Sequence, residues 1–168
     1  RIDDELITQP YEYPLGVTTV ECVAVDAAGN RSEPCSFTVT VEDEQGPAFT
    51  CRQNATVEIT SCASLTLTAD DVITNGLAGI TDNCCTDGFV ISIEPSMFEC
   101  PELGTPNQIT VTVEDCNGAS TTCTATVIFT GPDCNENGLA DACDVCSGFS
   151  LDCNENWVPD ECECFWCN

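Results

Sequence analysis

Apolar and polar residues alternate along most of the first 130 positions of the chain, which is the pattern of strands with one buried face. Residues 17–25 and 35–41 follow a period of two and are rich in valine and threonine, which favour strands. Between them, Asp26-Ala-Ala-Gly29-Asn30 supplies Gly and Asn, which tolerate the positive φ angles of tight turns. The pattern predicts a β-hairpin over residues 17–41.

A second stretch repeats this hairpin pattern near the end of the alternating region. Residues 108–115 and 123–129 alternate in the same way on either side of Cys116-Asn117-Gly118, and Asp115 stands 89 positions after Asp26. Such self-similarity indicates two copies of one module. The second copy has a full upstream half, whereas the first has only its last strands.

The upstream half of the second copy predicts further short elements. We expect strands at 55–59, 65–67 and 89–93 and a short helical turn at 69–72. About seven short strands over roughly 85 residues are typical of a β-sandwich. The predicted fold class is all-β: an immunoglobulin-like β-sandwich plus an incomplete β-module, with a disulfide-rich C-terminal calcium-loop segment. The expected domains are residues 1–45 for the incomplete module, 46–131 for the sandwich and 132–168 for the calcium loops.

Several segments of the alternating region resemble the hyalin repeat, an immunoglobulin-like extracellular module associated with adhesion. The segments are Tyr13-Pro-Leu-Gly-Val-Thr-Thr-Val-Glu-Cys22, Asp26-Ala-Ala-Gly-Asn30, Cys35-Ser-Phe-Thr-Val-Thr-Val41, Thr81-Asp-Asn-Cys84 and Phe98-Glu-Cys100. The resemblance implies disulfides between Cys22 and Cys35, and between Cys100 and either Cys84 or Cys85. Spacing alone does not fix the other pairings; the open candidates are Cys62 with the other member of that adjacent pair, and Cys51 with Cys116 or Cys123.

The first module lacks its opening half, which leaves strand edges and an apolar face exposed. Three arrangements are open. The fragment packs onto the second domain as an extra sheet, or a neighbouring subunit supplies the missing strands and builds a fibre. In the third, the chain is a piece of a longer protein.

After Gly131-Pro132 the pattern changes to two oxygen-rich loops that begin 19 positions apart, at Asp133 and Asp152. Oxygen-bearing side chains fall at positions 1, 3, 5, 9 and 12 of each loop, as in EF-hand loops, where position 7 adds a backbone carbonyl. The first loop keeps Gly138 at position 6. The second carries Trp157 there, which we expect to strain the turn or displace a ligand.

The two loops resemble those of dockerins and thrombospondin type 3 repeats, and are most similar to tandem Asp-Cys-Asn-x-Asn-Gly segments of bacterial secreted proteins. Cysteines at loop positions 2 and 11 distinguish them. The segments after each loop are too short for helices longer than about two turns, so we expect a structural cap or subunit joint. The resemblance implies these calcium ligands: Asp133, Asn135, Asn137, Leu139 (carbonyl), Asp141 and Asp144, then Asp152, Asn154, Asn156, Val158 (carbonyl), Asp160 and Glu163. Two disulfide turns without metal are the alternative interpretation.

The chain has 16 cysteines and no histidine, which favours disulfides over thiolate metal ligation and indicates an extracellular or cell-surface location. Bridges between subunits through Cys164 or Cys167 are compatible with this composition. The chain opens without a signal peptide, so a secreted protein would have a processed or internal N-terminus here. No apolar run reaches the ~20 residues of a membrane helix, which predicts no membrane insertion.

Charge narrows the function classes further. Three Lys+Arg stand against 29 Asp+Glu, a net charge of −26 that repels phosphate backbones and excludes nucleic-acid partners. Without histidine or lysine the commonest general base and Schiff-base amine are missing, so we expect no enzyme and no small-molecule substrate. Calcium in the oxygen-rich loops would offset part of the self-repulsion.

The leading functional prediction is a calcium-binding structural subunit of an extracellular fibre or matrix, such as that of a biofilm, which self-associates by strand complementation. The alternative is an adhesion or anchoring module of a larger secreted protein. Weaker cation candidates are Asp26 with Asn30, Asp82 with Asn83, and the run Glu42-Asp43-Glu44, all of which are equally compatible with solvated turns and linkers.

Overall fold

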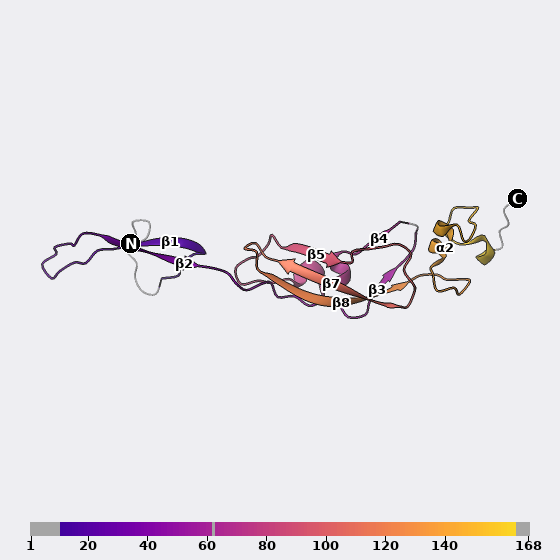
Figure 1. The fold of residues 1–168 in the computed structure, drawn as a ribbon, viewed down its shortest axis with the longest axis horizontal. Helices are drawn as coiled ribbons and strands as arrows, with labels where there is room; N and C mark the ends of the chain where they lie inside the picture. Colours follow the sequence, from indigo (N-terminus) through magenta and orange to yellow (C-terminus); the bar gives the residue numbers. More distant parts are fainter. Residues whose placement is uncertain (1–10, 62, 164–168) are drawn as a thin grey trace. The chain divides into compact units, whose positions relative to one another are not determined.

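The computed structural model describes residues 11–61 and 63–163, and most of its regular structure is β-strand, with few helices and many disulfides (Figure 1). The predicted all-β class is therefore confirmed. The chain divides into two compact units, Arg1–Glu44 and Gln45–Asn168. The C-terminal loops belong to the same compact unit as the main sheet.

The first unit contains the predicted hairpin. Strands β1 (Gly16–Cys22) and β2 (Cys35–Val41) pair antiparallel, with Val20 opposite Phe37. Cys22 and Cys35 lie directly opposite each other at the last pair of the ladder, but both thiols are free. The register thus brings together the two cysteines that the hyalin resemblance pairs, without a bond between them.

The main sheet of the second unit has four strands in the order β3-β8-β7-β5. β3 is parallel to β8, whereas β8 with β7 and β7 with β5 are antiparallel. A separate two-stranded ladder pairs β4 with β6. The bounds are Ala55–Glu58 for β3, Leu65–Thr66 for β4, Val90–Glu94 for β5, Met97–Phe98 for β6, Pro106–Glu114 for β7 and Ser120–Thr130 for β8.

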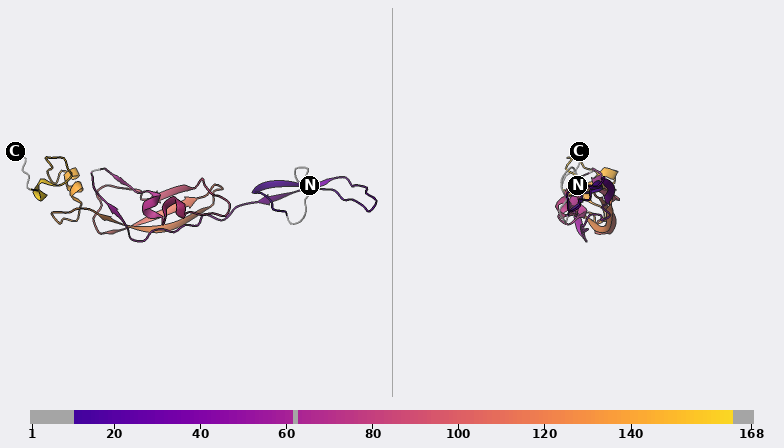
Figure 2. Two further views of the ribbon diagram at one scale, coloured as in Figure 1. Left: turned by 180° about the vertical axis from the view of Figure 1, so that it is seen from behind. Right: turned by 90° about the vertical axis from the view of Figure 1, so that its left-hand side faces the viewer.

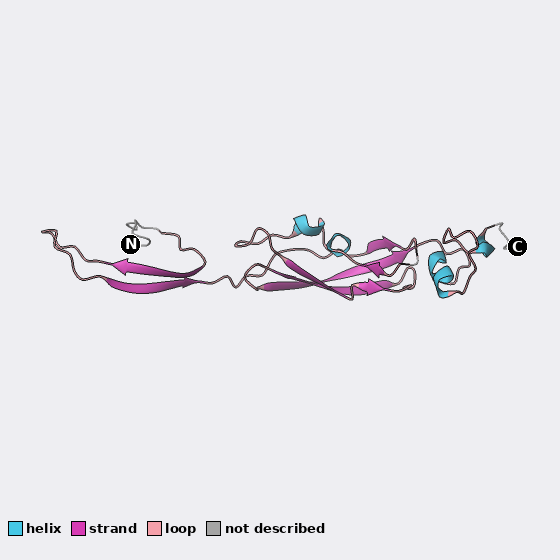
Figure 3. Cartoon of the chain, turned by 90° about the horizontal axis from the view of Figure 1, so that it is seen from above, coloured by secondary structure: helices cyan, strands magenta, loops and turns pink. Residues whose placement is uncertain are grey.

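Two short helices cover one face of this sheet, midway along it (Figures 2 and 3). The helix α1 (Ala69–Val72) coincides with the expected helical turn and starts with a capping box, in which the Asp71 carboxylate accepts from the Thr68 backbone amide. The 3₁₀ helix η1 (Gly76–Gly79) follows and was not expected from the sequence.

The core forms where alternate residues of β7 and β8 face α1. Fully buried side chains come from every second position of the two strands and from the end of α1: Ile109, Val111, Val113, Ala125, Val127, Phe129, Val72 and Ile73. The disulfide between Cys51 and Cys123 closes this region, which confirms one of the two partners expected for Cys51. Phe98 of β6 lies against Phe129, with ring centroids 4.8 Å apart.

The C-terminal segment continues from this core. The helix α2 (Asp141–Ser147) lies beyond the end of the sheet at which β3 and β8 end (Figure 1). The 3₁₀ helix η2 (Asp160–Cys162) follows it along the chain. Cys143 is bonded to Cys100, and Ala140 is completely buried in the same core cluster. The seven residues of α2 agree with the expected limit of about two turns.

The expected pairing of Cys100 with Cys84 or Cys85 is wrong. Cys85 is bonded to Cys116, and Cys100 to Cys143. The reason is tertiary: the turn after β7 meets the turn that contains Cys85, and α2 meets the end of β6. The expected roles of Cys62, Cys164 and Cys167 lie outside the described residues.

Replacing Phe129 by alanine is expected to lower the free energy of unfolding by about 3–5 kcal/mol, because this ring is fully buried and its removal leaves a cavity. Chemical denaturation of the full chain measures the change. Phe149→Ala is the matched control: Phe149 is 74% exposed, so a change within about 0.5 kcal/mol is expected. Equal losses in the two variants would contradict this description of the core.

Candidate metal centre

The first C-terminal loop is closed by its own backbone and by two aspartates. The amide of Asp141 donates to the Pro132 carbonyl at 2.8 Å, and the Asp141 carboxylate accepts from the Cys134 amide at 2.8 Å. At position 1, the two oxygens of Asp133 accept from the amides of Asn137 and Gly138, at 3.1 and 2.9 Å. These contacts wrap residues 133–141 into a tight coil.

Position 12 of this loop is a buried carboxylate. Asp144 is 1% exposed and lies in the first turn of α2. The side-chain amides of Asn135 and Asn137 donate to it over 2.9–3.0 Å. Side chains from positions 3, 5 and 12 therefore converge on one point, as the sequence register predicts.

The second loop reproduces these contacts 19 positions later. Asp152 accepts from the amides of Asn156 and Trp157, at 3.2 and 2.8 Å. Asn154 and Asn156 each donate a side-chain hydrogen bond of 2.8 Å to Glu163. The amide of Asp160 donates to the Leu151 carbonyl at 2.8 Å and its carboxylate accepts from Cys153, as Asp141 does in the first loop.

Trp157 takes the backbone conformation that Gly138 takes in the first loop. Its φ is 67° and that of Gly138 is 88°, both in the left-handed region that disfavours a bulky side chain. The amides of both residues donate to the position-1 aspartate of their loop. The hydrogen-bond pattern of the second loop is thus kept despite the tryptophan.

The charge around the first loop is unbalanced. Among the described residues, the Asp144 carboxylate accepts hydrogen bonds from neutral side-chain amides and from no basic side chain, and the sequence has three Lys+Arg in all. A buried carboxylate without a cationic partner is costly. Turning the amides of Asn135 and Asn137 over would present their Oδ1 atoms to the same point. The atoms that would then face this point, carboxylate and amide oxygens, are the ligands that hard divalent cations prefer.

The remaining expected ligands have different positions. Leu139 and Val158 each donate a backbone hydrogen bond to the position-5 asparagine of their loop, so they lie at the turn where a position-7 carbonyl is needed. Asp141 and Asp160 hold the backbone of their loops. The sulfurs of Cys134 and Cys162 approach Asp141, but they are bonded to each other and are not thiolate ligands.

Cysteines join the loops to their surroundings. Cys134 at position 2 of the first loop is bonded to Cys162 at position 11 of the second, and Cys143 at position 11 of the first is bonded to Cys100. Cys146 and Cys153 each take part in a disulfide as well. The two loops are therefore fixed to each other and to the sheet by covalent bonds.

Two of the weaker candidates of the β region lie in turns, and the third, residues 42–44, directly follows β2. Asp26 accepts a side-chain hydrogen bond from Asn30, which, with backbone amides, lowers the pKa of its carboxyl. Backbone amides of Cys85 and Cys84 donate to Asp82 and likewise lower its pKa. Asp115, which the sequence marks only as the repeat equivalent of Asp26, is 3% exposed.

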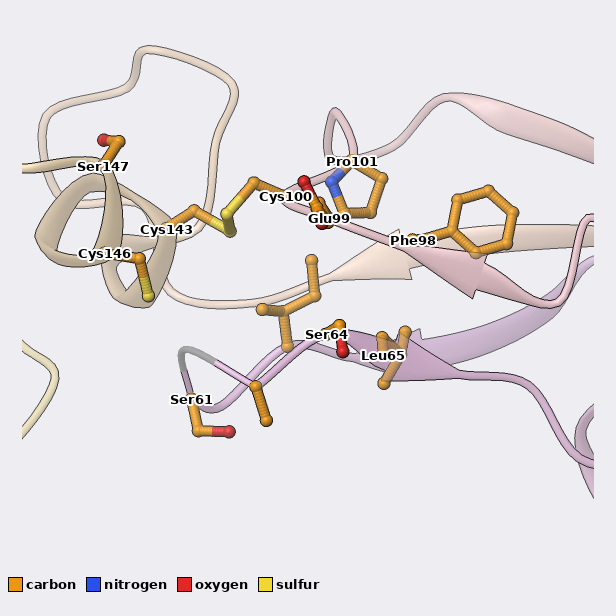
Figure 4. A pocket seen from close by; sticks show the side chains of 12 residues that line it. Ser61, Ser64, Leu65, Phe98, Glu99, Cys100, Pro101, Cys143, Cys146 and Ser147 are labelled. Carbon is orange, nitrogen blue, oxygen red and sulfur yellow. A yellow bond between two sulfur atoms is a disulfide. The ribbon is translucent and has the colours of Figure 1, made fainter.

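A cavity of about 460 Å³ separates α2 from the strands β4 and β6 (Figure 4). Phe98, Leu65 and several serines line it, with the Cys100–Cys143 disulfide on the side of the helix. Among its described lining residues Glu99 is the only ionisable side chain other than cysteine. The described lining of the cavity is therefore mostly apolar side chains and serine hydroxyls, without two ionisable groups that could act as an acid and a base.

A family model matches part of the chain. The family model of the HYR domain, the hyalin repeat, matches residues 7–41. HYR domains are extracellular modules of an adhesion type. No curated protein matches the chain. The match covers the β1–β2 hairpin and supports the resemblance stated for that region.

A separate observation concerns membranes. In the stretches 11–61 and 63–163, no helix is long and apolar enough to cross a bilayer.

Glycine is expected to be more stable than alanine at position 6 of both loops, by about 1–2 kcal/mol, because a Cβ disfavours the left-handed backbone there. The comparison is Gly138→Ala against the native chain, and Trp157→Gly against Trp157→Ala, which cancels the loss of the indole. Space is not the cause at Gly138, since a Cβ would meet nothing within 4 Å. Unfolding in chelator measures both differences, and alanine equal to glycine at either position would contradict the assigned conformation.

Proposed function

We propose that this protein is a calcium-binding structural subunit of an extracellular fibre or matrix. The observation that carries the proposal is the buried Asp144, which accepts hydrogen bonds from Asn135 and Asn137 and has no cationic partner within residues 11–61 and 63–163. The same pair of asparagine hydrogen bonds recurs around Glu163 of the second loop, which is half-buried. Two copies of one oxygen cluster in tandem favour a repeated ligand over a chance contact.

Calcium is the cation that this donor set fits best. Each loop offers carboxylates at positions 1 and 12, asparagines at 3 and 5, a backbone carbonyl at 7 and an aspartate at 9, which often acts through water. Soft metals would need thiolates or imidazoles, and the chain has no histidine. Bound calcium would also reduce the self-repulsion of a chain with a net charge of −26. The tandem loops then form a dockerin-like or thrombospondin type 3-like segment of a bacterial-type secreted protein.

The sheet unit fits an immunoglobulin-like sandwich. Three features support this assignment: the four-stranded sheet, the separate β4–β6 ladder, and a first strand of the unit that is parallel to its last. In this proposal the calcium loops cap one end of the sandwich through the Cys100–Cys143 disulfide.

Self-association follows from a comparison of the two hairpins. In the second unit β5 pairs with the edge of β7, and β3 with the edge of β8. In the first unit, β1 and β2 form a sheet of two strands, and the described residues supply no neighbour to either edge. An edge of this kind accepts an added strand. We propose that a second copy of the chain supplies it.

One large apolar side chain of the first hairpin, Phe37, agrees with a missing cover. Counted from the matching cysteines Cys35 and Cys123, Phe37 corresponds to Ala125. Phe37 is 51% exposed, whereas Ala125 is fully buried. Val20, directly opposite Phe37 in the ladder, is 4% exposed, so the open part of this face lies around Phe37. Burial of such side chains against added strands would stabilise an assembly.

An adhesion or anchoring module of a larger secreted protein is the second candidate, and the HYR match favours it. Both candidates are non-enzymatic and extracellular, and neither needs a small-molecule substrate or nucleic acid. They differ in the occupant of the β1–β2 edges, which is a second copy in the first case and further strands of the same protein in the second.

Asp144→Asn is expected to weaken calcium binding by the first loop about tenfold or more, which is about 1.4 kcal/mol, because one ligand charge is lost at nearly constant shape. Chelation should lower the Tm of the native protein and first increase hydrogen exchange in residues 132–163, since binding stabilises the folded state. Calorimetric titration and exchange mass spectrometry measure the two effects.

The control for this prediction lies in the same loop. Glu136→Gln also removes one negative charge, but from an exposed side chain at position 4, outside the ligand register. Its calcium affinity should stay near that of the native chain. A native Tm that does not respond to chelator, or equal weakening in the two variants, would reject the calcium assignment.

Filaments are expected in calcium-containing solutions of the purified chain, and Phe37→Ser should prevent them because it removes apolar surface from the open hairpin. Negative-stain electron microscopy with light scattering provides the measurement. Phe149→Ser is the matched control, since Phe149 is 74% exposed and lies outside the hairpin. Monodisperse native monomers at high concentration would reject the fibre and favour the adhesion module.

A further inference from the structure

The turn after β7 has the same backbone as the turn after β1. Asp26 and Asp115 each accept from the amides two and four residues later with one carboxylate oxygen, over 2.8–3.0 Å. Gly29 and Gly118 take φ angles of 88° and 94° and donate to the carbonyl of the aspartate. The two copies of the repeat thus build one kind of turn.

The turns differ in what their second carboxylate oxygen contacts. In the first turn, the side-chain amide of Asn30 donates to Oδ2 of Asp26 at 2.8 Å. The residue at the same place in the second turn is Ala119, which has no donor side chain. Oδ2 of Asp115 is buried and has no hydrogen-bond partner, and the whole residue is 3% exposed.

A second unpartnered carboxylate oxygen lies beside it. Asp82 uses Oδ1 to accept from the amides of Cys84 and Cys85, at 2.9 and 2.8 Å, while its Oδ2 is buried without a partner. A carboxylate oxygen of Asp82 and one of Asp115 lie within 4.8 Å of each other. The Cys85–Cys116 disulfide joins the two turns and holds the carboxylates together.

Two carboxylates this close repel each other unless a proton or a cation lies between them. No hydrogen bond joins them, and neither accepts from an arginine among the described residues. The amides that donate to Asp82 lower its pKa, which favours the anionic form over a shared proton. The sulfur of Cys85 is no ligand, because it is bonded to Cys116.

We propose that Asp82 and Asp115 form a cation site of their own, separate from the C-terminal loops, which binds calcium through their Oδ2 atoms. Water completes the coordination shell, because two carboxylates supply fewer than the about 6–8 oxygens that calcium takes. The disulfide and the amide hydrogen bonds place both oxygens before the ion arrives. An affinity in the range of extracellular modules, with a Kd of about 10⁻⁴–10⁻³ M, is expected for such a site.

Ala119→Asn tests the site without removing either carboxylate. The new side-chain amide should donate to Oδ2 of Asp115, as Asn30 does to Asp26 in the first copy, and so take the place of the ion. Equilibrium dialysis with radioactive calcium at low millimolar concentration should show the loss of one calcium per chain relative to the native protein. The Tm measured in chelator should rise, because the buried oxygen gains a partner.

A second variant keeps the test decisive if Ala119→Asn does not fold. Asp115→Asn keeps the oxygen that accepts the turn amides and should also lose one calcium. Asp87→Asn is the control, an exposed acidic residue in the same loop as Asp82, and should bind as many ions as the native chain. Native stoichiometry in a folded Ala119→Asn or Asp115→Asn variant would overturn the proposal. The difference between variants does not depend on whether the C-terminal loops bind calcium.

Discussion

Hydrogen bonds from backbone amides to aspartate oxygens hold together the turns on which this protein depends. Asp26, Asp82, Asp115, Asp133 and Asp152 each accept from amides a few residues further along the chain. Such a bond fixes the path of the turn and also fixes the place of the carboxylate. The same interaction therefore shapes the backbone and positions the charges that a cation would neutralise.

The chain has few positive charges, so the positions of its carboxylates strongly affect its stability. With three Lys+Arg and no histidine, the chain cannot pair its 29 acidic side chains internally. The buried ones among the described residues, Asp115, Asp141 and Asp144, have neutral hydrogen-bond donors or other acids as neighbours. Disulfides hold these groups close together at a fixed distance, since Cys85–Cys116 and Cys134–Cys162 each join two acidic turns. If the proposed cation binds, the stability of the fold and the binding of the ion would depend on the same charge balance.

Local patterns predicted the local structure well. The alternation in residues 17–25 and 108–115 gave the hairpins because a strand with one buried face needs a period of two. The loop register at Asp133 and Asp152 likewise anticipated which side chains converge, because those contacts span at most 12 residues. The Cys100–Cys143 bond and the approach of Asp82 to Asp115 depend on how distant segments pack, and no spacing encodes that. For the approach of Asp82 to Asp115, the sequence holds one signal: the repeat position that is Asn30 in the first copy is Ala119 in the second.

The disulfide connectivity also governs how the second unit would carry tension. Cys51–Cys123 and Cys100–Cys143 overlap in sequence, so a load entering before Cys51 passes through sulfur to β8 and leaves near α2. Most of the backbone between Cys51 and Cys143 lies outside this covalent path, so it cannot be extended by the load while the disulfides are intact. Under load this part of the second unit would therefore extend little until its disulfides are reduced, whereas the first hairpin, whose Cys22 and Cys35 are free thiols, has no such limit.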